Sequence, residues 1–202
     1  MLVELTTDEV KEINDGKDFN ILLTVEDLDK DITKSEKEDM EDAMEEEKLT
    51  LGKYLDITLT KQILDGKKVE DSEAVEETSD DVEIVFELTD ALLNKDDKVT
   101  RTYKVLRLHD GKVTVIDAEY DKDDKTVTFE TDKFSTYALT YQDKDKDGKV
   151  VETEKEDTDS ASGTVMPDAG DNMNVILYAL AAGLSMTALV GYFVYNKKKN
   201  MK

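Results

Sequence analysis

The sequence has no cysteine, no tryptophan, one proline and one histidine among its 202 residues. The lack of cysteine excludes a disulfide framework, a thiolate metal site and a cysteine nucleophile. A single histidine, His109, excludes most zinc sites that are built from histidine ligands. We interpret His109 as a residue of a hairpin turn rather than half of a catalytic dyad with Asp110, because no partner nucleophile accompanies it. The lack of tryptophan also argues against the aromatic-lined cleft of a glycosidase. We therefore predict that the protein is not an enzyme.

Basic side chains are scarce as well, and the formal net charge is -23. Such a chain repels phosphate backbones, so we expect no nucleic-acid partner. It also repels the anionic face of a membrane, except through its C-terminal tail. The last seven residues of the chain contain no acid and four lysines, which are Lys197, Lys198, Lys199 and Lys202.

Short β-prone runs separated by turn signals fill residues 17–142. In Tyr54–Thr60, for example, Leu55, Ile57 and Leu59 alternate with polar residues, which is the period-two pattern of a half-buried strand. Asp65-Gly66 and Asp110-Gly111 are favoured hairpin turns. Such a series indicates an antiparallel sandwich or barrel, and we predict a mainly β, sandwich-like domain. The expected strands are Phe19–Val25, Tyr54–Thr60, Val82–Leu88, Val99–Leu108, Lys112–Ala118, Thr126–Thr131 and Phe134–Tyr141.

One short helix is expected within this domain. Ser35 and Glu38 have the spacing of a capping box, in which each side chain bonds the other residue's backbone amide. The helix then runs to about Glu47, with Met40, Ala43 and Met44 on one face. Residues 1–16 are interpreted as a polar lead-in without a signal peptide. For an exported protein, this predicts that the chain is the C-terminal part of a longer protein or a truncated gene model.

The C-terminal third has a different composition. Residues 143–165 are too polar to pack, which indicates an extended, disordered linker. Residues 175–195 form an uncharged apolar run whose length matches the hydrocarbon core of a bilayer, so we predict a single transmembrane helix there. Residues 196–202 would be its basic cytoplasmic tail. A buried soluble helix is the alternative for the apolar run.

The start of the linker fits the pattern of a calcium loop. Carboxylates stand at the first, third, fifth and twelfth positions, with Gly148 at the sixth, where a sharp turn is needed. Against this interpretation, the segment before the loop is predicted to be a strand rather than a helix. We favour a solvated linker and no cofactor, and keep calcium as the alternative. The candidate ligands are Asp143, Asp145, Asp147 and Glu154.

A short motif that contains the only proline of the chain precedes the apolar run. Its residues are Met166, Pro167, Asp168, Ala169 and Gly170. With the span and tail in order behind it, the motif resembles the sortase sorting signal of Gram-positive surface proteins, Leu-Pro-x-Thr-Gly. Met166 replaces the leucine and Ala169 replaces the threonine. The resemblance implies a sortase and a cell-wall peptide as partners, and cleavage between Ala169 and Gly170.

The domain before the signal carries a second resemblance. Leu108-His-Asp-Gly-Lys-Val113 and Thr128-Phe-Glu-Thr-Asp-Lys-Phe-Ser-Thr-Tyr-Ala-Leu139, with the earlier Tyr54-Leu-Asp-Ile57, resemble a β-rich module near the anchor of clostridial-type surface proteins. This resemblance implies a stalk or spacer module without catalytic residues. We therefore expect a structural protein on the cell surface, attached to the cell wall. The alternatives are a membrane-anchored protein that is never cleaved, and an adhesin or ligand-binding module.

Overall fold

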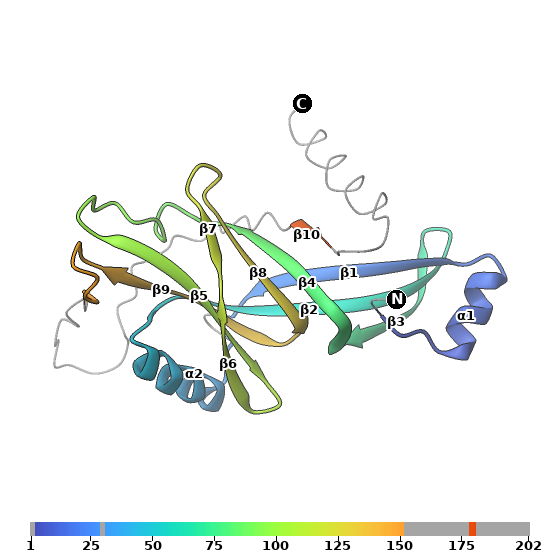
Figure 1. Ribbon diagram of the computed structural model, residues 1–202. Coiled ribbons are helices and arrows are strands. Elements are labelled where there is room, and N and C mark those ends of the chain that lie inside the picture. Colours follow the sequence, from blue (N-terminus) through green and yellow to red (C-terminus); the bar gives the residue numbers. More distant parts are fainter. Residues whose placement is uncertain (1–2, 29–30, 152–177, 181–202) are drawn as a thin grey trace.

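The computed structural model describes residues 3–28, 31–151 and 178–180. Within these ranges the fold is mainly β, with two short helices (Figure 1). The helices are α1 (Thr7–Asn14) and α2 (Lys34–Glu47). The strands are β1 (Asp18–Asp27), β2 (Thr50–Asp65), β3 (Lys68–Val75), β4 (Glu77–Glu87), β5 (Thr100–His109), β6 (Lys112–Asp117), β7 (Glu119–Asp121), β8 (Thr126–Lys133), β9 (Thr136–Lys144) and β10 (Tyr178–Leu180).

The strands form two antiparallel sheets, which confirms the mainly β, sandwich-like prediction. The larger sheet has the order β1-β2-β9-β5-β6, with β3 also paired to β2, and the smaller sheet has the order β10-β4-β8-β7. The main core lies between them. Alternate residues of β2 (Leu55, Ile57 and Leu59) pack with residues of the smaller sheet such as Ile84 and Phe129. Each of these buried side chains contributes roughly 1.5–3 kcal/mol through removal of apolar surface from water.

Strand β2 is long enough to pair with two different strands, β9 and β3, along one of its edges. On one edge, residues 50–56 pair with β9 and residues 59–65 pair with β3. The other edge pairs with β1 along residues 55–64. The C-terminal half of β2 therefore extends beyond the sandwich as a three-stranded arm, and α1 lies at the far end of this arm in Figure 1.

Helix α2 covers the outer face of the larger sheet and forms a second apolar cluster. Met40 and Met44 are buried against Tyr54, Leu106 and Ala138. Their spacing of four residues places both side chains on one face of the helix. The predicted helix and its buried methionines are therefore confirmed, and Ala43 is partly buried beside them.

The predicted cap of α2 is wrong by two residues. The N-cap is Thr33, whose hydroxyl accepts from the Glu36 amide at 3.3 Å, while the Glu36 carboxylate accepts from the Thr33 amide at 3.0 Å. Both pairs have the capping-box spacing. The earlier pair forms the cap because Glu36 also accepts a hydrogen bond from Thr136 on β9, at 3.0 Å, which joins the start of the helix to the sheet.

The N-terminal segment interpreted as a polar lead-in contains helix α1. Thr6 caps this helix: its hydroxyl accepts from the Glu9 amide at 3.2 Å, and the Glu9 carboxylate accepts from the Thr6 amide at 2.6 Å. Val3, ahead of the helix, is buried in the main core. The Thr-x-x-Glu spacing is visible in the sequence, but the segment lacks an apolar stripe long enough to suggest a helix.

The predicted strands are present, but β2 extends four to five residues beyond both predicted ends and β4 begins five residues early. Strands β3, β7 and β10 were not predicted. Strand β3 is almost wholly exposed, so its sequence shows no apolar alternation. The two Asp-Gly turns also differ from each other. Asp110 and Gly111 both have positive φ, as a type I′ turn requires, whereas the β2–β3 turn is centred on Gly66 and Lys67, with positive φ only at Gly66.

The structure describes only a few of the residues for which C-terminal features were predicted. Strand β9 continues to Lys144, so the predicted linker begins inside the fold, and residues 145–151 fold back on its end. Of the predicted transmembrane span, Tyr178–Leu180 form strand β10 on the edge of β4, and the rest lies outside the described residues. No helix within the described residues has the length and apolarity that a membrane crossing requires.

Candidate functional site

The predicted sorting signal, Met166, Pro167, Asp168, Ala169 and Gly170, lies outside the described residues. Its cleavage between Ala169 and Gly170 stays a prediction. The chemistry that the structure does describe is concentrated where the chain enters and leaves the sandwich, and both places contain a buried cation.

At the C-terminal end of β9, the first residue of the predicted calcium loop is paired with an arginine. Arg101 on β5 donates from Nε and Nη2 to the two carboxylate oxygens of Asp143, at 2.8 and 2.6 Å. Its Nη1 donates to the carbonyl of Leu92 at 2.9 Å, and its guanidinium lies 3.7 Å from the ring centroid of Tyr141. We call Arg101, Asp143 and Tyr141 the Arg101 cluster.

Within the Arg101 cluster, the positive charge of Arg101 is balanced by the negative charge of Asp143. The side chains of Arg101 and Asp143 are 13% and 17% exposed. Burial lowers the pKa of Arg101, but Asp143, with smaller contributions from Tyr141 and Tyr103, gives a net rise, so the guanidinium stays charged. A bidentate pair of this kind is both stronger and more directional than a single charged hydrogen bond. Asp143 therefore serves as the partner of Arg101 in the described structure.

The rest of the predicted calcium loop forms a tight turn. The carboxylate of Asp145 accepts from the backbone amides of Asp147 and Lys149, each at 2.9 Å, and Gly148 has a φ of 77°. Glu154, the predicted twelfth ligand, lies outside the described residues. In the part of the chain that is described, no three His, Cys, Asp or Glu side chains are grouped so as to hold a metal ion.

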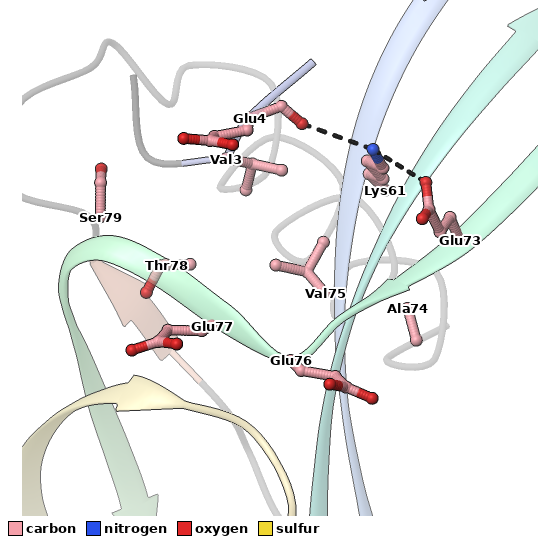
Figure 2. Close-up of a pocket in the computed structure, with 10 residues that line it drawn as sticks. All are labelled: Val3, Glu4, Lys61, Glu73, Ala74, Val75, Glu76, Glu77, Thr78 and Ser79. Carbon is pink, nitrogen blue, oxygen red and sulfur yellow. Dashed lines mark hydrogen bonds and ion pairs between the residues drawn. The ribbon is translucent and has the colours of Figure 1, made fainter. Parts of the chain in front are cut away.

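At the other end of the sandwich, Lys61 on β2 holds the N-terminal segment. Its ammonium lies 3.0 Å from the carboxylate of Glu9 on α1 and 2.8 Å from that of Glu73 on β3. It also donates to the carbonyl oxygen of Glu4 at 3.4 Å, and Figure 2 shows the ammonium between Glu4 and Glu73. We call Lys61, Glu9 and Glu73 the Lys61 cluster.

Both buried members of the Lys61 cluster are charged. The side chains of Lys61 and Glu9 are each 9% exposed. The hydrogen bonds that Lys61 donates to Glu73 and Glu9, together with the charges of these carboxylates, raise the pKa of Lys61 against the opposing effect of burial. Burial also raises the pKa of Glu9, but the Thr6 amide and Lys61 outweigh it, and the net pKa is lowered. The raised pKa therefore favours the charged form of Lys61, in which the nitrogen has no free lone pair.

The Lys61 cluster borders a hollow of about 440 Å³ between the N-terminal segment and the turn from β3 to β4. Glu4, Glu73, Glu76 and Glu77 line much of it, and Val3 and Val75 supply apolar surface (Figure 2). Small-molecule sites are usually enclosed and mainly apolar, with a few convergent polar groups. Repeated carboxylates beside a neutralised lysine do not fit that description, and we assign the hollow no ligand.

Another largely buried cation lies at the opposite end of β5 from Arg101. Arg107 donates from Nη1 to Thr131 and Asp132 on β8, both at 2.8 Å. The Thr131 hydroxyl lies 2.9 Å from that of Tyr137, whose pKa burial raises to about 12. Burial also raises the pKa of Asp132, but Arg107 more than offsets this and lowers it. Burial therefore favours the protonated phenol of Tyr137, and Arg107 favours the ionised form of Asp132.

His109 ends strand β5, next to the type I′ turn. Its Nε2 lies 3.6 Å from Asp110, whose side chain is 90% exposed. The structure therefore places His109 beside the turn, as predicted.

The roles of Lys61, Arg101 and Arg107 were not predicted, although the sequence carries a signal for them. Lys61 stands between Leu59 and Ile63 on the buried face of β2. Arg101 and Arg107 are in phase with Tyr103 and Val105 on β5, and they are the only arginines of the chain. A basic residue at one of the apolar positions of an alternating strand pattern indicates a buried partner of opposite charge.

Comparison with protein-family models, with curated proteins and with solved structures gave no match to this chain. The resemblance to a clostridial-type surface module therefore stays a prediction.

Proposed function

We propose that the protein is a non-enzymatic stalk module of a cell-surface protein, attached to the cell wall through its C-terminal sorting signal. In this proposal a sortase cuts between Ala169 and Gly170 and transfers the chain to a cell-wall peptide. The apolar segment 175–195 and the lysines behind it hold the chain at the membrane until the cut is made.

The observation that carries this proposal is the position of the two ends of the fold. The N-terminal segment is held at Lys61, whereas Thr50 on β2 pairs with Tyr141 near the exit of β9. Lys61 and Thr50 lie eleven residues apart on one strand, which corresponds to at most ~36 Å at about 3.3 Å per residue. A module whose chain enters at one end and leaves at the other spaces its neighbours apart.

The chemistry of the described residues also supports a structural role. Each buried cation is paired within the fold, and Tyr137 and Lys61 are held in their unreactive protonated forms. The acidic surface keeps such a module soluble and well separated from other acidic surfaces.

The test is mass spectrometry of surface protein from a host that carries the cognate sortase. We expect a C-terminus at Ala169 joined to a wall-peptide fragment. Pro167→Ala should leave the protein uncut, because proline fixes the bend that seats the peptide in the enzyme groove. Ala169→Thr should increase cleavage by an ordinary sortase, because it restores the usual fourth residue of the motif. Intact Lys202 in all surface-exposed molecules would contradict the proposal and favour a permanent membrane anchor.

A further inference from the structure

Strands β1 and β9 run in the same direction on opposite edges of β2. In β1, Asp18 faces Leu64 and Asp27 faces Leu55. In β9, Thr136 faces Asp56 and Tyr141 faces Thr50. Strand β1 thus starts at the C-terminal end of β2, and β9 finishes at its N-terminal end. Tension between the start of β1 and the end of β9 would pull these two strands along β2 in opposite directions.

This geometry loads the hydrogen-bond ladders in shear. Ladder bonds in an antiparallel pair lie perpendicular to the strands. A force along the strand axis therefore strains all bonds of the ladder together, whereas a force across one end opens them one after another. All ten residues of β1 pair with β2, and all nine residues of β9 pair with β5. Because β9 also pairs with β2, it is held on both edges.

The Arg101 cluster secures the end of β9 on which the tension would act. The two parallel hydrogen bonds between Arg101 and Asp143 join β5 to β9 next to the last paired residues, Thr100 and Lys144. The amide of Val151 donates to the carbonyl of Asp143 at 2.8 Å, so force applied at Val151 reaches the fold close to this pair.

We propose that β1 and β9 form a shear clamp about β2, which resists tension between the chain ends and is reinforced at its C-terminal end by the Arg101 cluster. This inference rests on the proposed function, because a stalk module bears tension between its ends.

The test is single-molecule force measurement on the full chain. Because the chain lacks cysteine, pairs of introduced cysteines set the pulling direction. Asp18→Cys with Val151→Cys loads β1 and β9 in shear. Asp18→Cys with Asp65→Cys shares one handle but opens the β1–β2 ladder from its end. We expect a several-fold higher rupture force for the first pair, and equal forces in the two directions would overturn the clamp.

The extension identifies the event that is measured. At about 3.4 Å per residue, full extension gives roughly 450 Å between residues 18 and 151 and roughly 160 Å between residues 18 and 65. A high-force event of the full length supports the clamp. Release of the longer length in small steps at low force would overturn it.

Arg101→Lys tests the reinforcement, because lysine keeps the charge but lacks the bidentate fork. We expect a lower rupture force for the Asp18–Val151 pair and an unchanged force for the Asp18–Asp65 pair. An equal loss in both directions would show a general loss of stability instead, and no loss would remove the cluster from the clamp. These results do not depend on a sortase, so failure of the clamp and failure of wall attachment remain distinguishable.

Discussion

At the scale of single residues, the buried cations explain how so acidic a chain closes its two ends. Lys61 draws α1 and β3 onto β2, and Arg101 joins β9 to β5. Leaving a buried charge without its partner costs far more than an exposed pair contributes. The surface pair of Lys34 and Glu38, whose side chains are 89% and 62% exposed, serves as a contrast.

We expect Lys61→Met to loosen the N-terminal segment while the sandwich stays folded. Glu9 would lose its cation inside a buried site, so its pKa should rise and α1 should exchange its amide protons faster. We estimate a loss of about 1–3 kcal/mol for the unpaired carboxylate. Hydrogen exchange of α1 measures the effect, with Lys68→Met as the control, because that side chain is 77% exposed. Equal protection in both variants would contradict this role of Lys61.

The same contact should depend on pH in a defined direction. The pKa of Glu9 is lowered in the fold, so the stabilisation is complete above the ordinary glutamate value and is lost as the pH falls through the folded value. The pKa of Lys61 is raised, so its contribution is complete below the ordinary lysine value and is lost as the pH rises through the folded value. NMR spectra should show α1 changing before the strands on acidification. Simultaneous changes in helix and strands would contradict this order.

At the scale of elements, the sequence predicted the strands that have one buried face and one more exposed face. Leu55, Ile57 and Leu59 alternate visibly, whereas β3 is exposed on both faces and is held by pairing with β2. Its presence depends on a neighbour, which a local pattern cannot reveal. The cap of α2 was predicted two residues late for a similar reason, since Thr136 is a hundred residues away from Glu36. The Lys61 and Arg101 clusters likewise join distant segments.

Gly52 supports the pairing of β2 with β9 through its lack of a side chain. A Cβ atom there would lie 2.9 Å from the carbonyl oxygen of Leu139 and 3.0 Å from Cδ2 of Leu92. The register shifts between Leu51 and Lys53, and the two strands approach closely at this irregularity. The carbonyl belongs to the central strand β9 and cannot move without disturbing its ladder.

We expect Gly52→Ala to destabilise the fold by about 1–3 kcal/mol, because the added methyl group overpacks a site bounded by backbone. Urea unfolding followed by circular dichroism measures the change. Thr60→Ala, on the same strand, serves as the control and should cost less than about 1 kcal/mol, the span of strand propensities. A Gly52→Ala midpoint equal to that of the control would show that the strands accommodate the methyl group.

At the scale of the whole molecule, the folded unit extends beyond the predicted boundaries at both ends. Residues 17–142 contain α2 and all strands except β10 and the end of β9, but they lack Glu9 and Asp143, the partners of Lys61 and Arg101. A chain cut at these limits would keep both cations and lose a carboxylate from each. The polar composition of the flanking segments hid this dependence, because only a few of their side chains contact the sandwich.

We therefore expect residues 3–151 and residues 17–142 each to fold into a mainly β protein. The shorter one should be less stable by roughly 2–6 kcal/mol, because it leaves two buried cations without a carboxylate partner, at about 1–3 kcal/mol each. Circular dichroism checks the β content, and urea unfolding gives the difference in stability. The double variant Glu9→Ala and Asp143→Ala in residues 3–151 separates the two ion pairs from the other contacts of the flanking segments. If the pairs dominate, its unfolding midpoint should lie near that of residues 17–142.

Equal stability of the long and short proteins would contradict the structural role of both clusters, and a disordered short protein would show that the flanking segments are needed for folding itself.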